Sequence, residues 1–148
     1  MTQSPVKTLY TIDFALWIEQ TVSSLKSQDY SNVDWENIIE EIESLGRRDR
    51  RELESGLTTL FEHALKRSYV NLPEYYGGWE ATISRTQQEL IRILRDSPSL
   101  GNYFLSIYNE CYHNARKNMS KEYDSKFPDD FPFPHDIDTL LNQSFWFE

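Results

Sequence analysis

The sequence contains a single cysteine, Cys111, among its 148 residues. One cysteine excludes an internal disulfide and a cage of several thiolates around a metal ion, because both need at least two sulfur atoms. An unpaired cysteine also fits a reducing compartment. We therefore expect a cytoplasmic protein.

Positive charge is also scarce, with 15 Lys and Arg residues against 24 Asp and Glu residues and a net charge of −9. A negative chain repels phosphate backbones, so general nucleic-acid binding is disfavoured. The sequence has no run of about 18 apolar residues, and its first residues, MTQSPVKTLYTID, have no apolar segment preceded by basic residues. We expect neither a membrane span nor an export signal.

Several motifs that carry chemistry are missing as well. The sequence has no Gly-rich phosphate loop, no His-Glu-x-x-His pair and no Gly-x-Ser-x-Gly turn. No cofactor, catalytic residue or metal ligand set is predicted on this basis.

Apolar and aromatic residues, in contrast, are sufficient for a folded core, at 39% and 14% of the chain. They recur every three or four positions, which is the helical spacing. The sequence predicts an all-α protein: a single domain over residues 1–148, folded as a helical bundle of about five main helices. Residues 1–10 are expected to be a flexible N-terminus, and residues 122–148 an extended, aromatic-rich segment docked on the bundle.

The boundaries of the predicted helices follow from breaks in this spacing. Gly46 suits a left-handed helix end, and Asp49 with Glu52 resembles a capping box, so one helix is expected to end near Gly46, with a single bent helix as the alternative. Pro73 and the Gly77-Gly78 pair are expected to end the next helix, and Pro98 to open a helix that reaches Met119. The apolar stripes that define these helices begin at Phe14, Trp35, Leu53, Trp79 and Leu100.

The C-terminal segment has a different composition, with three prolines in the stretch KFPDDFPFPHD. Prolines favour extended chain, and a short helix is expected only near Ile137 to Leu141. Five aromatic rings in this region would form an unusually large apolar patch if they were exposed together. We therefore expect them to pack on the bundle or on a second copy: Phe131, Phe133, Phe145, Trp146 and Phe147.

Five stretches of the sequence carry a family resemblance: LYTIDFALWIEQ, VDWENIIEEIESLGRRDRRELES, LFEHALK, WEATISRTQQELIRILRDSPSL and LLNQSFWF. In this order they resemble domain-of-unknown-function family twenty-nine, a bacterial and largely cyanobacterial family. The resemblance covers nearly the whole chain and implies an all-helical fold. It implies no activity, so no functional residue is transferred. The family usually has serine where this chain has Asp49, and both can cap a helix.

Three glutamates, Glu36, Glu40 and Glu43, form one stripe on a predicted helix. With about 100° of rotation per residue and Trp35 at zero, they lie at about 100°, 140° and 80°, while the apolar residues centre near roughly −20°. Glu43 can also pair with Arg47, four residues on. The favoured interpretation is a solvated helix side, and the alternative is an acidic docking stripe.

The histidines and the remaining arginines give weaker signals. Glu110 and His113 match half of a di-iron motif, but the second half is missing and His113 is expected to face solvent. His63 lies at the edge of an apolar stripe, where a partly buried ring with one hydrogen bond is favoured over catalysis. Arg85, Arg92 and Arg95 share an outer helix face that could contact an anionic partner, although solvation is the simpler interpretation.

The favoured function is a protein-binding or regulatory module without its own chemistry, acting on an unknown protein partner or by self-association. The alternative is a metal-dependent or hydrolytic enzyme with a cleft near His63 and neighbouring carboxylates. The same reasoning predicts Cys111 to be an inert core residue, because it lies on the apolar side of its helix.

Overall fold

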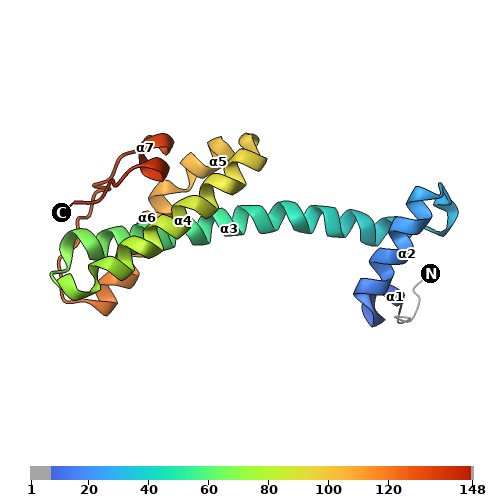
Figure 1. The fold of residues 1–148 in the computed structure, drawn as a ribbon, viewed down its shortest axis with the longest axis horizontal. Coiled ribbons are helices and arrows are strands. Elements are labelled where there is room, and N and C mark those ends of the chain that lie inside the picture. The colour runs from blue at the N-terminus through green and yellow to red at the C-terminus, as the bar shows by residue number, and fades with distance from the viewer. Residues whose placement is uncertain (1–7, 148) are drawn as a thin grey trace. The chain divides into compact units, whose positions relative to one another are not determined.

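The computed structural model describes residues 8–147, and within that range every regular element is a helix. This confirms the all-α prediction (Figure 1). The α-helices are α1 Leu9–Ile12, α2 Phe14–Lys26, α3 Trp35–Tyr69, α4 Tyr76–Asp96, α5 Gly101–Ser106, α6 Tyr108–Glu122 and α7 Ile137–Asn142. Short 3-10 turns at Tyr30–Asn32, Pro73–Tyr75 and Pro98–Leu100 precede α3, α4 and α5. No described helix has both the length and the apolarity needed to cross a membrane.

The chain divides into two compact units, Met1–Arg47 and Arg48–Glu148, which we call the N-terminal and C-terminal units. Helix α3 contributes its first turns to one unit and the rest to the other. The expectation of a single domain stays a prediction. A flexible N-terminus was predicted for residues 1–10. Residues 1–7 of this segment lie outside the described residues, whereas Leu9 and Tyr10 belong to α1.

The N-terminal unit is held by helix caps, a side-chain hydrogen bond and aromatic contacts. The Asp13 side chain accepts a hydrogen bond from the Leu16 amide at 3.1 Å, which satisfies a free donor at the start of α2. The Tyr10 hydroxyl donates to the Glu41 carboxylate and so ties α1 to α3. The rings of Tyr10 and Trp17 meet edge to face at 4.8 Å, and Trp17 is the one buried residue among residues 8–47.

Helix α2 ends in a Schellman motif centred on Gln28. The Asp29 amide donates to the Ser24 carbonyl at 2.9 Å, and the Gln28 amide donates to the Leu25 carbonyl at 3.2 Å. Gln28 therefore adopts a φ of 61°, a left-handed conformation that glycine reaches without steric cost.

We expect Gln28→Gly to raise the free energy of unfolding by about 1 kcal/mol, because a side chain in the left-handed region costs roughly that much. Urea titration of both proteins would measure the change. The matched control is Gln28→Ala, which keeps a Cβ and should give no gain. Equal stabilisation by both variants would show that the backbone at residue 28 is not the cause.

Helix α3 runs through Gly46 without a break, so the helix end predicted there was wrong. No described glycine has a positive φ, and Gly46 therefore does not take the left-handed cap conformation. A glycine inside a helix costs only about 1 kcal/mol relative to alanine. The flanking Arg47–Glu43 and Arg48–Glu52 pairs, each four residues apart, help to offset that cost.

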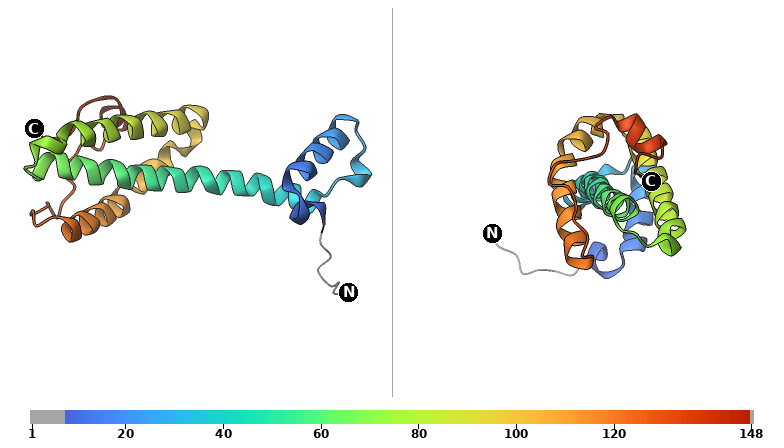
Figure 2. Two further views of the ribbon diagram at one scale, coloured as in Figure 1. Left: turned by 60° about the horizontal axis from the view of Figure 1, so that its bottom comes forward. Right: turned by 90° about the vertical axis from the view of Figure 1, so that its left-hand side faces the viewer.

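The C-terminal unit is built around the second half of α3. Figure 2 shows this part of the helix with α4 and α6 on different sides of it. Its inward residues are all fully buried: Leu53, Leu57, Leu60, Phe61, Ala64 and Leu65. Helix α4 approaches closely at Gly56, where an added Cβ would lie 2.8 Å from a methyl group of Leu90.

Two further predicted boundaries differ from the structure. Gly77 and Gly78 lie in the first turn of α4 and do not separate it from α3, because Val70 to Tyr75 already form the connection. The single helix predicted to reach Met119 is interrupted at Ile107, which has φ −97° and ψ 0° and separates α5 from α6. Both Phe104 and Tyr108 are nevertheless buried, so the break keeps the apolar residues on either side in the core.

The C-terminal segment packs on this unit as the sequence predicts. Phe133 and Phe145 are buried with their rings 5.2 Å apart, and Phe133 stacks on Phe61 at 6.3 Å. The amide group of Gln87 on α4 donates to the carbonyls of Leu140 and Gln143 at 2.8 and 3.0 Å, which holds α7 against α4.

Candidate protein-binding surface

Exposed large apolar side chains are concentrated in the N-terminal unit. Among the described residues, ten of them belong to this unit: Ile12, Phe14, Leu16, Ile18, Val22, Tyr30, Trp35, Ile39, Ile42 and Leu45. Over its described residues, 48–147, the much larger C-terminal unit contributes only Tyr75, Leu105 and Phe147. A helical bundle implies that the apolar stripes of α2 and early α3 face a core, but among residues 8–47 this is true in full only of Trp17.

On α3 the exposed apolar residues form a continuous stripe, which we call the α3 stripe. It consists of Trp35, Ile39, Ile42 and Leu45, whose side chains are 48%, 55%, 64% and 54% exposed. At about 100° per residue they span roughly 120° of the helix circumference. Ile38, which is partly buried, lies within this span, and Glu41, which bonds Tyr10 of α1, lies beyond one edge of the stripe. Helix α1 therefore flanks one edge of the stripe.

The other edge of the α3 stripe is bordered by Glu36, Glu40 and Glu43, which we call the acid row. All three are exposed, with side-chain exposures of 58% for Glu40 and 61% for Glu43. A guanidinium nitrogen of Arg47 lies 2.9 Å from Glu40 and 3.9 Å from Glu43. The sequence placed the acids correctly on the helix, but it missed that the apolar residues beside them are also in solvent.

Helix α2 adds a second exposed apolar area. Ile18 and Val22, one turn apart, line an open groove of about 720 Å³ together with Glu19, Ser23, Lys26 and Ser27. The same unit carries eight carboxylates over residues 8–47 against the two basic residues Lys26 and Arg47, a net charge of −6. Residues 48–148 carry sixteen carboxylates against twelve basic residues, a net charge of −4 over a much longer stretch.

His63 is a partly buried ring with one protein partner, as expected. Its Nδ1 lies 3.0 Å from the Thr59 carbonyl, and burial lowers the pKa of the ring, which favours the neutral form. The neighbouring Glu62 instead accepts a hydrogen bond from Asn118 at 2.9 Å. Over residues 8–147 no three His, Cys, Asp or Glu side chains are grouped so that they could hold a metal ion, and His113 is exposed.

Cys111 is buried and is one of the residues of α3 and α6 that line a pocket of about 350 Å³. Burial raises the pKa of its thiol, which therefore stays protonated at neutral pH and is a poor nucleophile. Glu54, a second lining residue, accepts a hydrogen bond from the Tyr103 hydroxyl at 2.7 Å.

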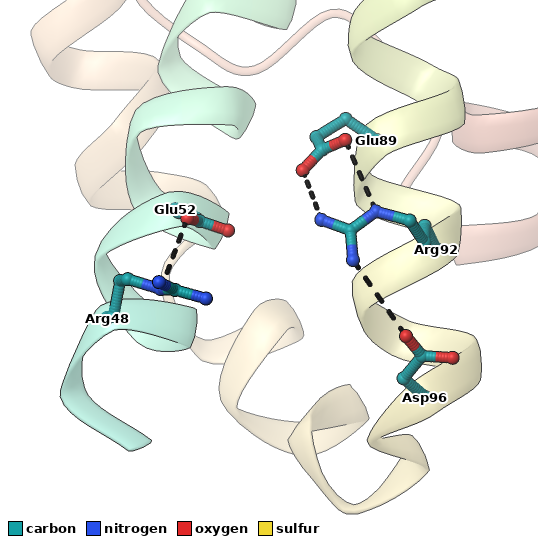
Figure 3. Close-up of polar contacts among 5 residues, drawn as sticks. All are labelled: Arg48, Glu52, Glu89, Arg92 and Asp96. Carbon is teal, nitrogen blue, oxygen red and sulfur yellow. Dashed lines mark hydrogen bonds and ion pairs between the residues drawn. The ribbon is translucent and has the colours of Figure 1, made fainter. Parts of the chain in front are cut away.

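Of the arginines that share the outer face of α4, Arg92 is engaged by acids of its own helix. Arg92 is paired with Glu89 at 2.5 Å and with Asp96 at 3.8 Å on its own helix (Figure 3). Arg85 donates to the Thr82 hydroxyl at 3.3 Å. Both side chains are exposed, and about half of the Arg92 side chain is in contact with solvent. The charge of Arg92 is thus compensated locally, which leaves little for an anionic partner.

The chain matches the family model described as Domain of unknown function DUF29 over residues 9–146. Comparison with curated proteins and with solved structures gave no significant match in either case. The family match includes both units, from α1 to the aromatic end of the C-terminal segment. Since it spans nearly all of the 148 residues, the chain belongs to the DUF29 family of domains of unknown function.

Proposed function

We propose that this chain is a protein-binding module whose C-terminal unit is a stable helical body and whose N-terminal unit carries the binding surface. The observation that supports the proposal is the exposure of ten large apolar side chains in one small unit. If each is about half exposed, together they present on the order of 800 Å² of apolar surface. A specific interface buries about that area on each partner.

The proposal includes no reaction of its own, and two side chains support that restriction. His63 is held by a backbone carbonyl, and its neighbour Glu62 is engaged by Asn118. Cys111 is a buried, protonated thiol. We place the module in the cytoplasm, which is supported by its single, unpaired cysteine and its acidic surface.

The test is to replace Ile39 and Ile42 with aspartate and to compare partner capture from cell extract. Both side chains are more than half exposed, so we expect the free energy of unfolding to change by less than about 1 kcal/mol. A specific partner should be captured by the wild-type chain and lost by the Ile39→Asp, Ile42→Asp variant, because charges in an apolar interface are strongly unfavourable.

The matched control is Leu105→Asp, which adds a charge at an exposed apolar residue of the C-terminal unit. This control should retain the partner. If the Ile39→Asp, Ile42→Asp variant is folded and captures the same proteins as the wild type, the α3 stripe is not a binding surface.

A further inference from the structure

We infer that the partner of the α3 stripe is an amphipathic helix of another protein that carries lysine or arginine along one flank of its apolar face. This inference rests on the proposed function and adds the chemistry of the partner. It is drawn from three features of the N-terminal unit: the shape of the stripe, the position of the acid row and the contact made by Arg47.

The shape of the stripe fits a helix. Trp35, Ile39 and Ile42 follow the spacing i, i+4, i+7, which is how one helix presents an apolar seam to another. From Trp35 to Leu45 the stripe is about 15 Å long, or roughly three helical turns. Helix α1 flanks one edge, and the acid row flanks the other. A partner helix lying along the seam would therefore have acids beside only one of its flanks.

The acid row sets the charge of that flank. Glu36, Glu40 and Glu43 repeat the same i, i+4, i+7 spacing over about 10 Å, so basic residues at matching intervals could each meet one carboxylate. Opposite charges beside an apolar seam determine which helices pair. The net charge of −6 on residues 8–47 favours a basic partner at longer range as well.

Arg47 shows that the acid row accepts a guanidinium group. Its Nη2 lies 2.9 Å from Glu40 Oε1, and its Nη1 lies 3.9 Å from Glu43 Oε2. The Arg47 side chain is 45% exposed, so a guanidinium of the partner could replace it. Within the described residues Glu36 makes no ion pair, which leaves one end of the row open to a partner.

A second copy of the chain fits this surface less well. It would bring a second set of residues 8–47, which also carry a net charge of −6. In an antiparallel pair, equivalent flanks of the two helices lie beside each other, so the two acid rows would meet. Like charges at that position disfavour association. Charge complementarity therefore favours a different, basic protein.

The probe for this inference is a synthetic three-heptad peptide with leucine along one face and lysine along one flank. Two control peptides have glutamate in place of each lysine, or the same composition in scrambled order. Titration of the full chain by calorimetry, at low and at high salt, gives the dissociation constants. We expect the lysine peptide to bind most tightly, and salt to weaken its binding, because exposed charges are screened.

Variants of the chain separate the roles of charge and apolar contact. Changing Glu36, Glu40 and Glu43 to glutamine should weaken lysine-peptide binding by about tenfold. The charge-matched control changes Glu74, Glu110 and Glu122, exposed residues of the C-terminal unit, to glutamine and should bind as the wild type does. Arg47→Ala should act in the opposite direction and tighten binding by roughly two- to fivefold, because it removes an internal competitor.

The outcomes distinguish this inference from the proposed function. If the lysine and glutamate peptides bind equally and both are lost in the Ile39→Asp, Ile42→Asp variant, the surface is real but the basic partner is wrong. The basic partner is also wrong if the wild-type chain binds neither peptide. Two other results would also contradict a basic partner. One is a dimer of the chain, seen by light scattering, that the Ile39→Asp, Ile42→Asp variant does not form. The other is binding to neutral phospholipid vesicles, seen by sedimentation, that this variant loses. If lysine-peptide binding is unaffected by that variant, both proposals fail.

Discussion

Replacing Phe61 with alanine is expected to lower the free energy of unfolding by about 3–5 kcal/mol, because a large ring is removed from a fully buried position. The Phe61 ring packs edge to face on Tyr108 at 5.9 Å and on Tyr112 at 6.1 Å, and it also meets Phe131 at 5.0 Å. It thus joins α3 to α6 and to the C-terminal segment. A loss of this size is a large part of the 5–15 kcal/mol that stabilises ordinary proteins.

Urea unfolding followed by circular dichroism would measure the effect of Phe61→Ala. The control is Leu105→Ala on α5, an exposed position where a change of less than about 0.5 kcal/mol is expected. If Phe61→Ala lowers the free energy of unfolding by as little as the control does, α3 does not have the central position in the core that Figure 2 shows.

Ending the chain at Ser144 is expected to lower the free energy of unfolding by about as much as Phe61→Ala does. The shortened chain loses Phe145, which is 7% exposed and packs on Phe133, and Trp146, which packs on Phe145 at 5.9 Å. It also loses the hydrogen bond from the Phe147 amide to the Ser68 hydroxyl at 2.9 Å. We expect a loss of roughly 4 kcal/mol, and hence a melting temperature lower by about 10 °C.

Thermal melting and light scattering would test the shortened chain, which should also aggregate because its loss uncovers apolar surface around Phe133. Phe147→Ala is the matched control, since that ring is 45% exposed and keeps the rest of the segment in place. A soluble shortened chain with an unchanged melting temperature would show that the aromatic end does not stabilise the C-terminal unit.

The helices and the docked segment could be predicted because they depend on local sequence. Apolar spacing identified the stripe from Leu53 to Leu65, and the prolines after Phe127 identified the extended segment. The break at Ile107 could not be found in this way. The apolar spacing continues through it, because Phe104 and Tyr108 are four residues apart and would share one face of an unbroken helix as well.

The exposure of the α3 stripe could not be predicted, because an apolar stripe has the same sequence pattern whether it meets a core or solvent. Ile42 and Leu57 occupy equivalent positions in the stripes of one helix, yet Ile42 is 64% exposed and Leu57 is fully buried. The difference lies in the number of helices available to cover each stripe. One signal was present in the sequence: residues 46–52 of α3 have no apolar side chain and so separate the two stripes.

That apolar-free stretch, residues 46–52, also limits how far local unfolding can spread along α3. Its helical form rests on backbone hydrogen bonds and on exposed ion pairs such as Arg48–Glu52, which contribute at most about 1 kcal/mol each. Such turns open locally far more often than turns that are fixed by a core. Fraying or ordering at Trp35 to Leu45 would therefore fade within the stretch before it reaches Leu53. The two ends of one unbroken helix can thus have independent stabilities. Local unfolding or ordering at residues 35–45 then leaves the stability of the core around Leu53 unchanged.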